Sequence, residues 1–198
     1  MIDIITRISL EDRSALGAVQ TEWAQVDFSD NTLVPNITFM EFSPFRPFAD
    51  KISLEAHLMV ASPEKYIKAA ADAGFKRIIA HVEAHDPRLF FEQVKFEDVE
   101  AGIAIDGPTE FEQVEPYLEE ADVVQVMMVE MGSDKFLPEC IEKIKSIHLY
   151  LPDLPIAVAG GITQQTARLL LEAGATRLVA DPAVAPLLSQ GHGMSRSG

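Results

Sequence analysis

The sequence predicts one α/β domain folded as a single (β/α)8 barrel, in which helices surround eight parallel strands. Short β-branched runs alternate with helical patterns eight times along the 198 residues. The runs at 123–129 and 156–159 are apolar at nearly every position, as expected for parallel strands covered on both faces. At this length the chain holds one well-buried domain, and eight β/α units within it favour a closed barrel over an open sheet.

The expected barrel covers residues 1–190, followed by a flexible C-terminal tail at 191–198 that contains only Gly, His, Met, Ser and Arg. Strands are expected near 2–9, 22–28, 52–60, 77–84, 101–106, 122–129, 155–160 and 176–181. Helical patterns between them include 63–74, 110–120, 138–151 and 163–173. Gly74 and Gly174 follow two helix ends, where glycine commonly terminates a helix, and Thr163 is the expected N-cap of the last helix. The proline-rich segment 29–51 leaves room for only a short helix.

Composition narrows the class of protein. The net charge of −15 argues against nucleic acid or an anionic membrane as partner, since both require a basic surface. No apolar run approaches the ~20 residues that span a bilayer, and the N-terminus lacks the basic region of a signal peptide. The single Cys140 excludes an intrachain disulfide and fits a reducing compartment, so we expect a cytoplasmic protein in which Cys140 is a small apolar helix residue.

Polar residues gather toward the carboxyl ends of three expected strands, where a parallel barrel places its active site. Period-2 alternation puts them in pairs on the inward face, with apolar alternates facing the helices. The inward pairs are Gln25 with Asp27, His57 with Met59, and His81 with Glu83; the outward residues are Val26, Leu58 and Val82. Burying such groups unpaired is costly, so we expect a functional pocket, with a fully hydrogen-bonded polar core as the alternative.

Several short motifs carry a resemblance to the ribulose-phosphate 3-epimerase family. They are VD at 26–27 with VPNIT at 34–38, HLMV at 57–60, SPEKYI at 62–67, HVEA at 81–84, KFLPE at 135–139 and GGI at 160–162. Their order and spacing are similar to the family's over nearly the whole chain, to about Pro186. The resemblance implies a ribulose-phosphate-binding barrel that interconverts D-ribulose 5-phosphate and D-xylulose 5-phosphate. It also implies a small anionic sugar phosphate as ligand and a homo-oligomer.

The family's reaction needs a base, an acid on the opposite face and a divalent metal that stabilises the enediolate. By resemblance, Asp27 matches the first catalytic aspartate, which is also a metal ligand, and His57 matches one metal-binding histidine. Gln25 stands in place of the other histidine, and Ala159 in place of the second aspartate. An amide is a poor substitute for imidazole at a transition metal. No cofactor is therefore certain; Asp27 and His57 would hold Zn, Fe, Mn or Co only weakly.

By the same resemblance, substrate binding falls to Arg7, His57, Met59, Met127, Gly132, Gly160 and Gly161. The family holds its phosphate with backbone amides after strands 7 and 8 and with a glycine-rich loop after strand 6. Here Asp181 and Pro182 replace Gly-Ser after strand 8, which adds a negative charge and removes an N–H donor. The loop at 130–136 is short, and its Lys135 fits a surface residue better than a phosphate ligand.

Arg7 replaces a substrate-contacting serine of the family. Its guanidinium would bind an anion, or neutralise Asp27 in an internal ion pair that fills the place of the metal. Three hypotheses stay open: an active epimerase with Asp181 as substitute acid, an altered isomerase with Asp27 as sole base, and a non-catalytic sugar-phosphate-binding or assembly barrel. The phenylalanines of segment 29–51 (Phe39, Phe42, Phe45 and Phe48) would pack on the barrel or form a subunit contact.

Overall fold

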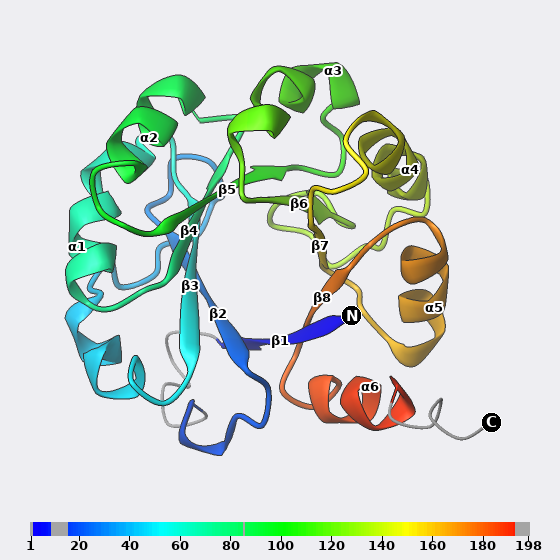
Figure 1. Cartoon of the computed structure of the whole chain (residues 1–198), viewed down its shortest axis with the longest axis horizontal. Coiled ribbons are helices and arrows are strands. Elements are labelled where there is room, and N and C mark those ends of the chain that lie inside the picture. The colour runs from blue at the N-terminus through cyan, green and yellow to red at the C-terminus, as the bar shows by residue number, and fades with distance from the viewer. Residues whose placement is uncertain (1, 9–15, 85, 193–198) are drawn as a thin grey trace.

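The computed structural model describes residues 2–8, 16–84 and 86–192, and in it eight parallel strands close into a barrel. Each strand is hydrogen-bonded to its sequence neighbours, and β8 returns to pair with β1 (Figure 1). The strands are β1 Asp3–Ile8, β2 Trp23–Ser29, β3 Ser53–Met59, β4 Arg77–His81, β5 Glu100–Ile105, β6 Val123–Met127, β7 Ile156–Ala159 and β8 Arg177–Ala180. The predicted fold class is confirmed, and each strand starts within one residue of its expected place.

Helices cover the outside of the barrel, as Figure 1 shows. They are the 3-10 helices η2 Ser43–Phe48, η3 Pro63–Lys65 and η4 Glu115–Glu120, and the α-helices α1 Ile67–Asp72, α2 Pro87–Val94, α3 Phe111–Val114, α4 Cys140–Tyr150, α5 Gln164–Glu172 and α6 Ala185–His192. Thr163 caps α5 by accepting from the Thr166 amide, as expected. None of the helices in the described ranges is long and apolar enough to cross a membrane.

Two helices were not among the sequence predictions. Helix α2 begins after Asp86, whose side chain accepts from the Leu89 amide, and has Pro87 in its first turn. This aspartate–proline pair is an ordinary helix start that the sequence analysis did not use. Helix α6 runs to His192, so it includes the first two residues of the expected tail. The remaining tail residues, 193–198, lie outside the described part of the chain.

Segment 29–51 contains the short helix that its prolines predict, and its aromatic rings extend the barrel's outer core. Phe42 stacks on Phe28 of β2 with 4.2 Å between ring centroids, and Phe45 meets Phe75 edge-on at 5.7 Å. Packing on the barrel is therefore confirmed for Phe42 and Phe45, and Phe48 packs against the same core. Phe39 is 66% exposed, and the alternative of a subunit contact stays a prediction.

Alternation along the strands separates an outer core from the barrel interior, as predicted. Val26 and Leu58 are buried in the outer core between strands and helices. Inside the barrel, an apolar layer fills the middle of the strands, and its residues include Ile5, Ile79, Ala104, Ala157 and Val179. On several strands the inward positions on either side of this layer are polar. The interior thus has one polar group at each end of the barrel.

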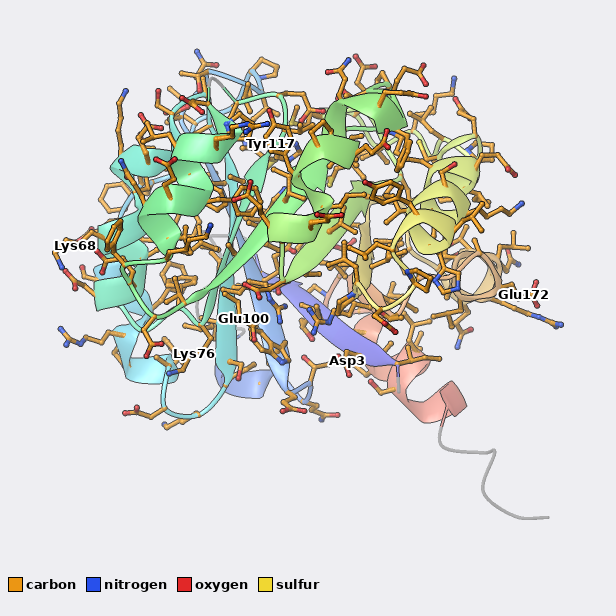
Figure 2. The ribbon with its side chains drawn as sticks, turned by 45° about the horizontal axis from the view of Figure 1, so that its top comes forward. Asp3, Lys68, Lys76, Glu100, Tyr117 and Glu172 are labelled. Atoms are coloured by element: carbon orange, nitrogen blue, oxygen red, sulfur yellow. The ribbon has the colours of Figure 1, made fainter. Side chains whose placement is uncertain are left out.

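The polar group at the amino end is an ionic cluster centred on Arg77, whose side chain is 1% exposed. Its guanidinium lies 2.6 Å from Glu55 and 2.5 Å from Glu100, and stacks 4.1 Å from the ring centroid of Trp23. Burial raises the pKa of Glu55 in spite of the Arg77 charge beside it, so ionisation of Glu55 depends on this partner. Figure 2 shows Glu100 at this end of the molecule, whereas Lys68 and Glu172 project outward from the surrounding helices.

Replacing Arg77 with Met should destabilise the barrel by about 3–5 kcal/mol, because Glu55 would remain buried without a cation. The matched control is Arg168→Met on α5, which breaks an exposed ion pair with Glu172 and should change stability little. Urea unfolding followed by circular dichroism measures both. Equal stability losses in the two variants would contradict a structural role for the Arg77 cluster.

Candidate active site

The polar group at the carboxyl end of the barrel is assembled by strand register. Arg7 on β1 pairs with Gln25 on β2, and Asp27 on β2 pairs with His57 on β3. Because the strands are parallel, these neighbours bring their side chains to the same end of the interior. Gln25, Asp27 and His57 come together as their predicted inward faces require, and Arg7, whose role was left open, joins them through its contact with Asp27.

Asp27 is the centre of this group. Its Oδ1 accepts hydrogen bonds from Gln25 Nε2 and His57 Nδ1, each at 3.0 Å, and its Oδ2 lies 3.8 Å from the Arg7 guanidinium. Burial raises the pKa of Asp27, but the His57 hydrogen bond and charge, Arg7 and Gln25 together lower it below its usual value. Asp27 is therefore a carboxylate at neutral pH. Its side chain keeps 22% of its surface exposed.

A second histidine continues the chain of hydrogen bonds away from Asp27. His57 Nε2 lies 2.8 Å from His81 Nε2, and His81 Nδ1 lies 3.0 Å from Glu83 Oε2. Each Nδ1 faces a carboxylate and so carries a proton, and the contact between the two Nε2 atoms needs one more. This pattern assigns three protons to four ring nitrogens, which amounts to one shared positive charge. Burial lowers the pKa of the His81 imidazole.

Glu83 anchors the far end of this chain. Its Oε1 accepts from the Asp106 amide at 2.9 Å. Burial raises the pKa of Glu83, but hydrogen bonds from His81, Thr109 and the Asp106 amide, with the His81 charge, lower it to about 2. Asp106 accepts from the Met131 amide at 2.7 Å, and burial raises the pKa of its own carboxyl. The strand predicted at 77–84 ends at His81, so Glu83 lies in the following turn and points back toward the histidine.

Arg7 bridges Asp27 to a carboxylate at the end of β8. Its Nε and a terminal nitrogen lie 2.8 and 2.7 Å from Asp181 Oδ1. Burial lowers the pKa of Arg7, but the charges of Asp27 and Asp181 raise it above its usual value. The side chain is 47% exposed, so the pair lies at the mouth rather than in the core. The ion pair with Asp27 predicted as one alternative for Arg7 is present at 3.8 Å, but the closer partner of Arg7 is Asp181, and the pair lies at the mouth instead of inside the barrel.

The β6–β7 side of the site is apolar. Ala159 is buried, has no group that can bind a proton or a metal, and pairs in register with Met127, which is also buried. Gly160 and Gly161 follow with φ of +90° and +63°. A Cβ at Gly160 would lie 2.8 Å from Val129, and one at Gly161 would lie 2.9 Å from Phe136. Glycine is therefore required at both positions, where Val129 and Phe136 pack close to the backbone.

The other predicted binding residues lie outside the hydrogen-bonded group. Met59 ends β3 beside Ser29, two positions beyond the Asp27–His57 pair. Gly132 is exposed, has φ of +81° and faces Pro35 across the mouth. Lys135 is exposed, as its surface interpretation predicts. Two surface depressions lie elsewhere, one beside α1 and α2 and one around Trp23 and Glu100 at the amino end.

The residues present do not fit the divalent metal that the family's chemistry implies. Both ring nitrogens of His57 are engaged in hydrogen bonds, Gln25 turns its amide nitrogen rather than its oxygen toward Asp27, and Ala159 offers no ligand. Within residues 2–8, 16–84 and 86–192, no three His, Cys, Asp or Glu side chains are grouped so that they could hold a metal. The structure therefore gives no support to the weak metal site predicted at Asp27 and His57.

The family model for the ribulose-phosphate 3-epimerase family matches residues 7–185. The chain belongs to this family. It is 35% identical over 170 residues to the ribulose-phosphate 3-epimerase of Bacillus subtilis, covering 80% of this chain and 77% of the relative. It is 32% identical over 171 residues to that of Schizosaccharomyces pombe, covering 83% and 75%. The chain is thus epimerase-like by descent, as its motifs indicate.

Solved structures show the same fold at lower identity. A mutant tryptophan synthase alpha-subunit from Pyrococcus furiosus superposes with a TM-score of 0.70, covering 96% of this chain and 92% of that chain at 14% identity. This similarity supports the barrel and carries no information on the reaction.

Sequence reasoning noticed His81 and Glu83 but gave them no role. The sequence feature that indicates a role is their spacing of two residues at the end of β4, the strand that follows the one carrying His57. Asp106 was not singled out, although a carboxylate immediately after β5 lies at the end of the barrel where the active site is expected. Cys140 is buried on α4, as its interpretation as a small apolar residue requires.

Glu83→Gln should make the protein less stable at neutral pH but not in acid. The folded-state pKa of Glu83, about 2, is lower than its ordinary value of 4.5, so the stabilisation is complete above about pH 5. It is lost as the pH falls toward 2. We expect the wild type to exceed the variant by roughly 2–3 kcal/mol at pH 7 and by little near pH 2. Urea unfolding at several pH values measures the difference, with Glu142→Gln on the exposed face of α4 as control. A difference that does not change with pH would contradict the assignment.

Proposed function

We propose that this chain acts as an isomerase-class protein on a small anionic ketose phosphate such as D-ribulose 5-phosphate, with Asp27 as its sole base. Asp27 removes the proton alpha to the carbonyl and returns a proton to the same face. The observation that carries the proposal is an ionised, partly exposed Asp27 at the barrel mouth, together with a β7 strand that ends in Ala159, which has no proton-transfer group.

The two oxygens of Asp27 are suited to different tasks. Oδ1 accepts from both Gln25 and His57, which fixes the plane of the carboxylate. Oδ2 has a longer 3.8 Å contact with Arg7, which is beyond hydrogen-bonding distance. A base must approach the proton it removes within hydrogen-bond reach, and Oδ2 is the oxygen left free to do so. This geometry therefore supports a carboxylate that is positioned through Oδ1 and removes the proton with Oδ2.

Inversion at a carbon requires an acid on the face opposite the base. The family's second aspartate would stand at Ala159, and Asp181, a carboxylate at this mouth, is already bound by Arg7. Proton exchange with solvent should therefore be faster than formation of the opposite epimer. The two glycines with positive φ just before the N-terminus of α5 support an anionic group at the β7 end of the ligand.

A second candidate function is a non-catalytic barrel that binds an anionic sugar or serves in assembly. The Arg7–Asp181 ion pair favours it, because the cation at the mouth is already neutralised and half of the family's proton-transfer pair is absent. The two functions differ in one measurable property, which is proton exchange at the carbon next to the ketone.

Proton NMR of D-ribulose 5-phosphate with the protein in D2O separates these functions. We expect loss of the C3 proton signal without a matching gain of D-xylulose 5-phosphate. Asp27→Asn should reduce the exchange rate by about 10²-fold or more, because the amide cannot accept the proton. Asp153→Asn, at an exposed position before β7, is the matched control and should exchange at the wild-type rate. Exchange and inversion at equal rates would contradict a sole base, and an absence of both would favour the non-catalytic barrel.

A further inference from the structure

We infer that Arg7 is a built-in cation that takes the place of the family's divalent metal, so that this site excludes metal ions. The inference deepens the proposed function, since the positive charge that an enolate needs would come from a guanidinium. It rests on the geometry around Asp27.

Position is the first argument. Arg7 is the direct β1 neighbour of Gln25, which stands where the family has a metal-binding histidine. From there its terminal nitrogen reaches to 3.8 Å from Asp27 Oδ2, the one Asp27 oxygen without a hydrogen bond from Gln25 or His57. A metal held by Asp27 would compete for the same oxygen. The guanidinium therefore lies on the side of Asp27 where a ligand's developing negative charge would form.

The state of the remaining donors is the second argument. A metal binds imidazole through an unprotonated nitrogen, but His57 faces Asp27 through Nδ1 and His81 through Nε2. Gln25 Nε2 donates to Asp27, and Gln25 Oε1 is buried away from this contact without a hydrogen-bond partner in the described chain. Metal binding would have to break the hydrogen-bond chain at two places.

Charge is the third argument. A guanidinium stays protonated at all ordinary pH values, so its charge is permanent. A unit charge about 4 Å from a dication's binding position raises the free energy of metal binding even where water screens it. Asp181 holds Arg7 in place from the other side through two nitrogens. Arg7 is thus fixed at the mouth, and the side of its guanidinium toward Asp27 can still contact a negatively charged ligand.

The test is titration with Co²⁺ alone, followed by calorimetry and by the visible absorption of bound cobalt. Wild-type protein should bind no Co²⁺ in the micromolar range. The variants are Gln25→His with Ala159→Asp, and the same pair with Arg7→Ser added. The triple variant should bind one equivalent, and the double variant should bind roughly tenfold or more weakly because Arg7 remains. Adding Arg168→Ser to the double variant is the matched control and should not strengthen binding.

Three results would overturn the inference. The first is micromolar binding of one Co²⁺ by the wild type, which needs no variant to fold. The second is equal affinity in the double and triple variants. The third is a triple variant that is folded by circular dichroism but binds no Co²⁺, because Arg7 would then not be what excludes the metal. Failure of proton exchange in the NMR experiment would remove the proposed function and leave the cobalt result unaffected.

Discussion

The hydrogen bond between Asp27 and His57 is the interaction on which the other contacts of the site depend. It places a proton on His57 Nδ1, because the ionised carboxylate can only accept a hydrogen bond. His57 Nε2 is then directed at His81, whose own Nδ1 is held by Glu83. The same bond lowers the pKa of Asp27 and keeps it available as a base. Removing Asp27 would leave the buried His57 Nδ1 without a partner, and removing His57 would leave His81 Nε2 without one.

The barrel accommodates this polar group because the two ends of its interior are separate. The apolar layer around Ile5, Ile79 and Val179 divides the Asp27 group from the Arg77 cluster. Each end satisfies its own charges, with Arg77 held by Glu55 and Glu100, and Arg7 by Asp27 and Asp181. Changes in the polar residues at the carboxyl end therefore leave the contacts of the Arg77 cluster in place.

Much of this arrangement was predictable from the sequence, because alternation in a parallel strand places inward residues unambiguously. The alternation of apolar and polar residues every second position predicts where the strands start and that Asp27 and His57 point inward. The contact between His57 and His81 does not, because it depends on the stagger between β3 and β4, where His57 pairs with Ile79 rather than with His81. The partners of Arg7 were open for the same reason. A long, flexible side chain reaches several neighbours, and only the position of Asp181 after β8 selects among them.

The charges at the carboxyl end bear on whether the site needs a dication. Three carboxylates take part in its chain of contacts, Asp27, Glu83 and Asp181. The positive charges among them are the Arg7 guanidinium and the proton shared by His57 and His81. Asp27 contacts both Arg7 and His57, so positive charge already lies beside this carboxylate without a dication, and removing Arg7 would leave Asp181 without its cation. Under the proposed function, Arg7, Gln25, Ala159 and Asp181 therefore act as one coupled set of residues.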